Sequence, residues 1–189
     1  DSVVSHTWSL AIEEQFYLLW PIVAYRFRRD TRSMVKALVA LIAVAWAARQ
    51  VLYYGFDVGQ SYIYHAFETR MDQLAVGCLL AVLLRKRMLH GFWRFACASP
   101  IAPAVVIAAL AVSSLLHHGS NTSRFTVGYT IEPVLTAILL VQLIVLSGHR
   151  VWGLFNSAPM LFLGRISYSL YLYQQITLHT ARRLTAGYP

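Results

Sequence analysis

Six apolar stretches of about twenty residues, separated by short polar connections, constrain the fold of this chain more than any other feature. A helix needs about 20 mostly apolar residues to cross the hydrocarbon core of a bilayer. The chain is 58% hydrophobic and only 13% charged, whereas soluble domains average about 25% charged residues. The sequence therefore predicts an all-α, polytopic transmembrane helix bundle, with six spans near residues 7–25, 34–53, 66–84, 97–116, 129–147 and 161–181.

The excess of basic residues, a formal net charge of +8, lies in short clusters beside the apolar stretches rather than along one face. This placement favours cytoplasmic anchoring over nucleic-acid binding, because cytoplasmic loops of membrane proteins are enriched in lysine and arginine. We therefore expect the first and third connections to face the cytoplasm, and no nucleic-acid partner. The two cysteines lack metal-ligand spacing, so no metal site is predicted. The clusters are Arg26, Arg28, Arg29, Arg32 and Lys36, and then Arg85, Lys86, Arg87 and Arg94.

Charged residues interrupt two of the apolar stretches. The third stretch is long enough to span only if it begins near residue 66, and the first only if it reaches back to about residue 7. A charged side chain at the centre of a spanning helix costs roughly 2.5–3.5 kcal/mol on insertion scales. The charges are therefore expected to face the protein interior or a wet cavity. They are Glu13, Glu14, Glu68, Arg70 and Asp72.

These charges allow three interpretations. The structural one is an ion pair in which Arg70 neutralises Glu13 or Glu14 and ties two helices together. The enzymatic one is a polar cavity open to the outside, where carboxylates position a hydroxyl-bearing substrate and Arg70 holds an anionic or carbonyl oxygen. The third is a transporter or channel segment, in which the same charges mark an ion or proton path.

Three motifs occur in a fixed order along the chain. Residues 8–21 read WSLAIEEQFYLLWP, residues 69–77 read TRMDQLAVG, and residues 163–172 read LGRISYSLYL. Together they resemble the acyltransferase family 3 membrane proteins, bacterial enzymes that O-acylate sugars of the cell envelope. The resemblance extends over the whole chain, which reads as the C-terminal portion, residues 1–189, of one such transmembrane domain.

The resemblance implies transfer of an acyl group, usually acetyl, from cytoplasmic acyl-CoA to a carbohydrate hydroxyl across the membrane. It implies a multi-pass protein of the bacterial inner membrane whose partners are lipid, the carbohydrate acceptor and acyl-CoA, with no bound cofactor. The chain departs from the family pattern in two places. The family's Arg-then-His motif, on its first helix, is not in this sequence, and Gln174 stands where the last motif usually has histidine. An inactive remnant is therefore a further alternative.

The candidate site residues come from these motifs and their surroundings. We expect catalytic roles for Glu13, Glu14, Arg70 and Asp72, because carboxylates exchange protons with sugar hydroxyls and a guanidinium holds phosphate or carbonyl oxygens. Asp72 is expected to set the geometry of Arg70. Structural roles are the alternative for two of the candidates discussed next. For His6 the alternative is a position at the membrane interface, and for Ser167 in the last motif it is close helix packing. The expected substrate-binding residues are His6, Tyr17, Ser167, Tyr168 and Gln174.

Overall fold

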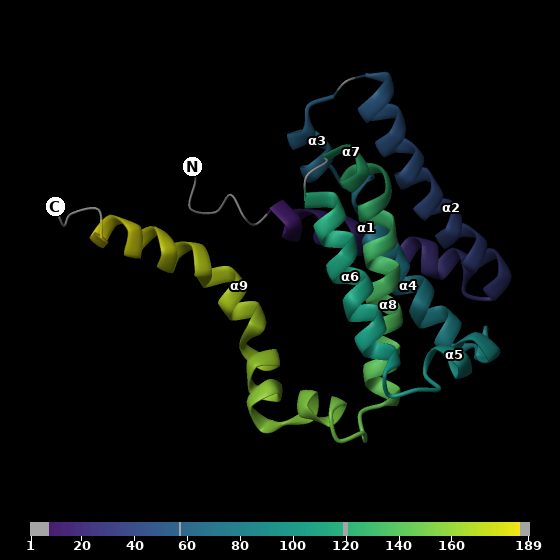
Figure 1. The fold of residues 1–189 in the computed structure, drawn as a ribbon. Helices are drawn as coiled ribbons and strands as arrows, with labels where there is room; N and C mark the ends of the chain where they lie inside the picture. Colours follow the sequence, from purple (N-terminus) through teal and green to yellow (C-terminus); the bar gives the residue numbers. More distant parts are fainter. Residues whose placement is uncertain (1–7, 57, 119–120, 186–189) are drawn as a thin grey trace. The chain divides into compact units, whose positions relative to one another are not determined.

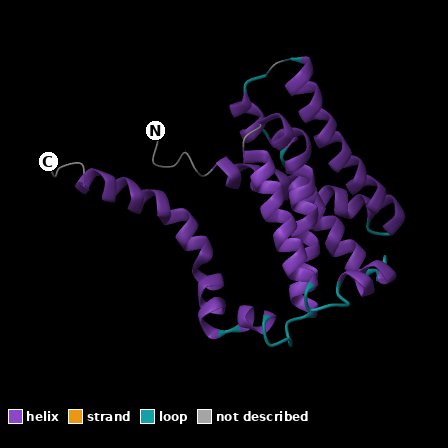
Figure 2. Cartoon of the chain, viewed as in Figure 1, coloured by secondary structure: helices purple, strands orange, loops and turns teal. Residues whose placement is uncertain are grey.

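The computed structural model describes residues 8–56, 58–118 and 121–185, and within these ranges every regular element is a helix (Figure 2). The predicted all-α class is therefore confirmed. The helices are α1 Trp8–Phe27, α2 Thr31–Gln50, the π-helix η2 Val51–Gly55, α3 Gln60–His65, the 3-10 helix η3 Phe67–Thr69, α4 Met71–Arg85, α5 His90–Ala96, α6 Ala102–His118, α7 Asn121–Ser123, the π-helix η4 Arg124–Gly128, α8 Tyr129–Val145, the 3-10 helix η5 Trp152–Asn156 and α9 Ala158–Thr185.

The chain divides into two compact units. The large unit covers Ile12–Leu146 and contains most of α1 and all elements through α8. The small unit combines the chain up to Ala11 with the segment from Ser147 onward, which holds η5 and α9. Inside the small unit the hydroxyl groups of Ser9 and Tyr171 are 2.5 Å apart and share a hydrogen bond. The beginning of the first sequence motif therefore contacts the last motif within this unit.

In the large unit, α2 packs along α4, α4 along α8, and α8 along α6 (Figure 1). The α2–α4 contact is built on small residues, since Ala45 and Ala75 are both fully buried. Alanines let two helices approach closely. Phe16 of α1, Leu38 of α2 and Met71 of α4 complete this buried cluster. The core thus brings the middle of α1 against the beginning of α4.

Among the described residues, two helical segments are long and apolar enough to cross a membrane, Thr31–Gly55 and Arg124–Val145. A shorter apolar helix covers Ala102–His117. Only 17% and 28% of the two long apolar windows are buried inside the protein. A core helix of a soluble protein would be mostly buried, so these exposed apolar surfaces fit a membrane protein.

The prediction of six spans is not reproduced as six long apolar helices. Helix α4 has 15 residues, which at 1.5 Å per residue covers only about 22 Å of a hydrocarbon core of about 30 Å. Glu13 and Glu14 lower the apolar character of α1, and Arg165 does the same in α9. All six predicted stretches are nevertheless helical over most of their length.

The predicted start of the third stretch near residue 66 is wrong. Ala66 has extended backbone angles (φ −76°, ψ 142°), and the chain enters α4 only at Met71. Between them lies the short 3-10 helix η3, held by the Thr69 hydroxyl, which donates to the carbonyls of Ile63 and Ala66 at 2.8 Å each. Glu68 and Arg70 therefore stand on a turn before the helix rather than inside it. The fourth stretch likewise begins at Ala102 rather than residue 97.

Candidate functional site

A buried arginine of α2 forms the centre of the charged cluster. Arg49 and Asp72 form an ion pair in which Nη2 lies 2.7 Å from Oδ2, and the two side chains are 0% and 1% exposed. Nη2 also donates to the hydroxyl of Thr130 at 2.5 Å, and Nη1 donates to the carbonyl of Thr69 at 2.6 Å. One guanidinium therefore ties α2 to the turn before α4, to α4 itself and to α8.

Arg49 was not among the residues predicted from the sequence, although a signal for it was present. Arg49 is an arginine inside the predicted apolar stretch 34–53, with alanines before it and Val51 and Leu52 close behind. Ionisable residues within apolar spans face a partner or a cavity, and this argument applies to Arg49 as much as to Arg70. Its partner was not evident, since Asp72 lies 23 residues further along and on another helix.

Arg70 lies between two aromatic rings. Its guanidinium carbon is 3.9 Å from the ring centre of Tyr129 and 4.7 Å from that of Tyr64, and its Nε donates to the carbonyl of Tyr64 at 3.1 Å. Such cation–π contacts hold an arginine while leaving it charged. The predicted pairing of Arg70 with Glu13 or Glu14 stays a prediction.

Asp72 and Arg49 together locate Arg70. Arg49 binds the backbone at Thr69 and the side chain at Asp72, which lie on either side of Arg70 in the sequence. Arg70 itself has φ −127° and ψ −14°, outside the regular helix that follows. Asp72 is thus connected to the turn that carries Arg70 through the side chain of Arg49. Its role in setting the geometry of Arg70 stays a prediction.

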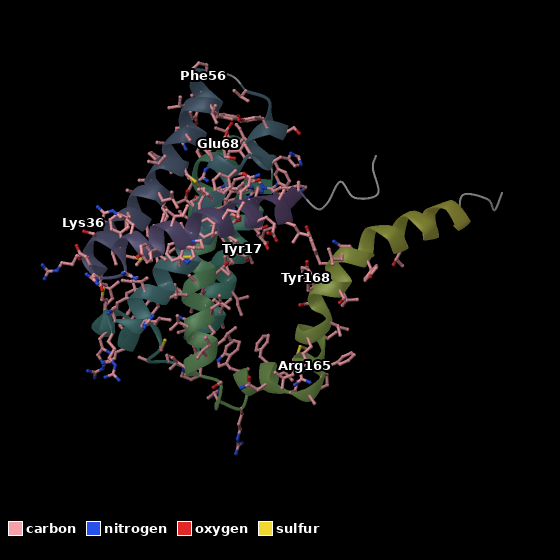
Figure 3. All side chains as sticks on the ribbon, turned by 180° about the vertical axis from the view of Figure 1, so that it is seen from behind. Tyr17, Lys36, Phe56, Glu68, Arg165 and Tyr168 are labelled. Atoms are coloured by element: carbon pink, nitrogen blue, oxygen red, sulfur yellow. The ribbon has the colours of Figure 1, made fainter. Side chains whose placement is uncertain are left out.

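The two glutamates of the first motif differ in exposure. Glu13 is half-buried on the flank of the face of α1 that buries Ile12 and Phe16, whereas Glu14 is exposed. Phe16 belongs to the same buried cluster as Met71, the first residue of α4. This packing brings the Glu13 region of α1 to the end of α4 that carries Asp72. Tyr17 is 55% exposed on α1 (Figure 3).

The remaining candidates belong to the small unit. The Ser167 hydroxyl donates to the carbonyl of Gly164 at 2.8 Å, one turn back along α9. Tyr168 is 61% exposed and projects from α9 in Figure 3, and Gln174 is exposed too. His6 lies outside the described residues. The substrate-binding roles of these residues remain predictions.

Two neighbouring cavities line the α1, α2 and α4 side of the large unit. The basic cavity, about 470 Å³, has Arg28, Arg85 and Lys86 at its rim and Trp20, Phe27, Met34 and Val82 on its walls. The apolar cavity, about 330 Å³, is also lined by Trp20 and Phe27 and extends to Phe67 and Met71. The two cavities therefore share a wall, and together they extend along α1 and α2 from the basic end of α4 toward the turn that bears Arg70.

A third cavity, the tyrosine groove, lies between α4 and α8. It measures about 480 Å³ and is lined by Tyr64, Arg70, Arg124, Tyr129, Glu132 and apolar residues of the two helices. Arg70 therefore opens onto a different side of α4 from the apolar cavity. In Figure 3, the labels Glu68 and Phe56 mark the end of the large unit that carries the turn before α4. Lys36 is labelled toward the opposite end of α2.

Comparison with known proteins gives one family and several curated relatives. The family model described as acyltransferase domain matches residues 1–189. A peptidoglycan O-acetyltransferase of Listeria monocytogenes is 30% identical over 195 residues, covering 95% of this chain and 30% of that protein. An O-acetyltransferase of Staphylococcus aureus is 28% identical over 184 residues, covering 90% of this chain and 28% of its own length. The chain thus spans less than a third of these relatives. No solved structure matches it significantly.

Proposed function

The chain belongs to the acyltransferase domain family, and from that membership we propose that the protein transfers an acyl group, expected to be acetyl, from cytoplasmic acyl-CoA to a carbohydrate hydroxyl across the membrane. The relatives named as O-acetyltransferases, one of them of peptidoglycan, support acetyl as the group and a cell-envelope glycan as the acceptor. The activity belongs to the whole protein, of which this chain supplies the part described above.

The observation that carries the proposal is the placement of cations at both ends of α4. Arg85 and Lys86 rim the basic cavity at one end, and Arg70 lies at the other. The positive-inside rule puts the Arg85 end in the cytoplasm. A donor that carries phosphates on the cytoplasmic side suits such a rim, because guanidinium and ammonium groups bind phosphate oxygens strongly.

The apolar cavity supports the same direction of transfer. It continues from Trp20 and Phe27, which it shares with the basic cavity, to Phe67 and Met71 beside Arg70. An uncharged acyl-bearing arm can occupy such a cavity while its phosphates stay at the rim, because apolar walls favour the arm and exclude water. The acyl carbon would then lie near the end of α4 that faces the acceptor.

The proposed reaction transfers the acyl group from the sulfur of the donor to the hydroxyl oxygen of the acceptor. The acceptor oxygen forms a bond to the acyl carbon, the bond from that carbon to the donor sulfur breaks, and the hydroxyl proton passes to a general base. We assign Arg70 to hold the acceptor near the acyl carbon, because a guanidinium binds oxygen atoms through directed, charge-assisted hydrogen bonds. Glu13 is assigned to orient the hydroxyl. Arg49 and Asp72 are positioning residues for Arg70.

The membrane arrangement is part of the proposal. We infer that α1, α4 and α9 cross the inner membrane, as do the two long apolar helices and α6, which gives the six spans that the sequence predicts. Their charged residues would face protein or a wet cavity, where pairing offsets the cost of burial. The buried Arg49–Asp72 pair is one such arrangement.

The test uses the full-length protein in sealed proteoliposomes, with acetyl-labelled acetyl-CoA on one side and a peptidoglycan fragment on the other. The wild type should acetylate the glycan, and Glu13→Gln and Arg70→Lys should each lower kcat at least 100-fold at unchanged protein yield. Lys36→Gln, on the exposed face of α2, is the control. Wild-type turnover by Glu13→Gln would remove that residue from the site, and no labelled glycan from the wild type would refute the proposed function.

A further inference from the structure

The tyrosine groove contains two arginines that converge on one phenol ring. The guanidinium carbons of Arg70 and Arg124 lie 3.9 Å and 5.8 Å from the ring centre of Tyr129. Arg70 comes from the turn before α4, and Arg124 comes from the turn before α8. Two cations that share one aromatic neighbour repel each other, so the arrangement favours an anion between or beside them.

The π-helix η4 produces this convergence. The Tyr129 amide donates to the carbonyl of Arg124, five residues earlier, instead of four as in an α-helix. In a regular α-helix, residues five apart point about 140° apart around the axis. The wider π turn brings Arg124 and Tyr129 onto the same side of the helix. The chain therefore uses an uncommon local structure, one frequent at functional sites, to turn Arg124 toward the groove.

The phenol oxygen of Tyr129 is an independent sign of a ligand. Tyr129 is 4% exposed, and its hydroxyl has no hydrogen-bond partner among the described residues. Buried hydroxyl groups in native structures nearly always have a partner, since a protein gives up hydration of that group on folding. The oxygen belongs to a residue that lines the groove. A ligand oxygen in the groove would satisfy it.

Glu132 distinguishes the groove from a simple phosphate site. Its Oε1 accepts a hydrogen bond from Ser113 at 3.3 Å, and it lines the groove one helical turn beyond Tyr129. The lining of the groove thus includes two arginines and this one carboxylate. Beside the two arginines, the Glu132 carboxylate accepts hydrogen bonds from sugar hydroxyls, which a bare phosphate group does not supply.

We propose that the tyrosine groove binds a carbohydrate carrying a carboxylate or phosphate group. Arg70 and Arg124 hold the oxyanion, the Tyr129 hydroxyl donates to it, and Glu132 accepts from neighbouring hydroxyls. The groove volume of about 480 Å³ suits a ligand of one or two sugar rings. This inference rests on the proposed function for its carbohydrate acceptor, and it adds Arg124, Tyr129 and Glu132 to the binding residues.

Glucuronic acid and glucose provide a matched pair of probes, because they differ only in a carboxylate that replaces a hydroxymethyl group. Binding is measured by ligand titration with saturation-transfer NMR, using the full-length protein in nanodiscs of uncharged phosphatidylcholine and no acyl donor. The wild type should bind glucuronic acid at least fivefold more tightly than glucose. The difference should shrink as salt is raised, because part of the attraction is between charges.

Three variants of groove residues and one control variant separate the contributions. Arg124→Gln should weaken glucuronic acid binding about tenfold, while Arg124→Lys keeps the charge and should recover much of it. Tyr129→Phe keeps the ring under Arg70 and removes only the hydroxyl, and should weaken binding by about fivefold. Arg94→Gln removes an exposed arginine of α5 outside the groove and should bind like the wild type. Arg124 is exposed, so its substitution leaves the core intact.

Each of three results would overturn the inference. The first is equal binding of the two sugars by the wild type, and the second is unchanged binding by both Arg124→Gln and Tyr129→Phe. The third is loss of glucuronic acid binding when a third of the lipid is replaced by anionic phosphatidylglycerol, which would identify the groove as a lipid site. Because no donor is present, these measurements do not depend on acyl transfer. Acetylation with no groove binding would refute this inference alone, and groove binding with no acetylation would refute only the proposed function.

Discussion

Arg49 Nη2 and Asp72 Oδ2 lie 2.7 Å apart in an ion pair whose side chains are 0% and 1% exposed to solvent. The pair joins two helices whose contact is otherwise apolar and includes both alanines, Ala45 and Ala75, and larger side chains such as Leu38. A buried pair of this kind does not by itself add much stability, because desolvation of both charges offsets their attraction. Its consequence is geometric: the turn bearing Arg70 has one position relative to α2.

Breaking the pair from one side should be more damaging than removing both charges. Arg49→Met leaves Asp72 charged and buried, and should cost about 3–5 kcal/mol of unfolding free energy. Arg49→Met combined with Asp72→Leu should cost less than either single change. Unfolding of the detergent-solubilised protein, followed by heat or denaturant, measures this. Lys36→Met on the exposed face of α2 is the matched control, and additive losses in the double variant would contradict the prediction.

Gly128 should not tolerate even one added carbon. A Cβ at this position would lie 3.0 Å from Cδ2 of His117, where α6 packs on the turn before α8. We expect Gly128→Ala to destabilise the protein by about 1–3 kcal/mol through overpacking. Gly77→Ala on α4 is the control, since its Cβ would meet nothing within 4 Å. Addition of His117→Ala should restore stability to Gly128→Ala, and a failure to do so would show that the cost lies elsewhere.

The start of α2 should weaken in acid. Asp30 caps this helix: its Oδ1 accepts from the amides of Arg32 at 2.9 Å and Ser33 at 3.2 Å, and its Oδ2 accepts from the Ser33 hydroxyl at 2.5 Å. The hydrogen bonds from Ser33, the largest influence, lower the pKa of Asp30 below its ordinary value of 3.8. A lowered pKa means that the stabilisation is present above pH 3.8 and is lost as the pH falls through the folded-state pKa.

Melting temperatures of the wild type and Asp30→Asn should therefore differ most at neutral pH and converge below about pH 3.8. Asparagine also caps helices but does not titrate in this range, so its own melting temperature isolates the effect of the charge. Ser33→Ala removes the largest influence on the Asp30 pKa, and it should move the convergence to higher pH. A difference that stays constant from pH 7 to pH 3 would contradict this account.

Donor binding should depend on the rim of the basic cavity. Arg85 and Lys86 are exposed and lie at the end of α4 away from Arg70. Replacing both with glutamine should raise KM for the acyl donor about tenfold and leave kcat within twofold, because these cations contribute to binding rather than to the transition state. Steady-state acetylation at 50 and 500 mM salt measures both parameters. Arg94→Gln is the control, and a fall in kcat with unchanged KM would contradict the role.

The fold class and most helix positions could be predicted from the sequence, because apolar periodicity and length decide where helices form. The ends of α1 and the start of α8 lie within two residues of the predicted bounds. The start of α4 was missed because length alone required a span from residue 66, whereas the hydroxyl of Thr69 stabilises a separate turn there. The length and hydropathy of an apolar stretch do not predict such hydrogen bonds between a side chain and the backbone.

The charged cluster was only partly predictable. Asp72 and Arg70 were found from their position at the edge of an apolar stretch, whereas Arg49 and its partner depend on how α2 rotates against α4. That rotation depends on packing between distant parts of the chain, such as Ala45 of α2 and Ala75 of α4 in the buried cluster, which no local pattern encodes. The convergence of Arg124 and Tyr129 was missed for a related reason: it requires a π turn, and helical periodicity assumes 3.6 residues per turn.

The contacts of Arg49 have a consequence for biogenesis. Among the described residues, the hydrogen-bond partners of the Arg49 side chain are all synthesised after it: Thr69 follows 20 residues later, Asp72 after 23 and Thr130 after 81. Until α8 has been made, this arginine lacks its complete set of hydrogen bonds, and its insertion into lipid is unfavourable. The large unit thus reaches its final packing only when translation has passed residue 130, and earlier ribosome-bound intermediates need water or the insertion machinery to accommodate a single unpaired cation.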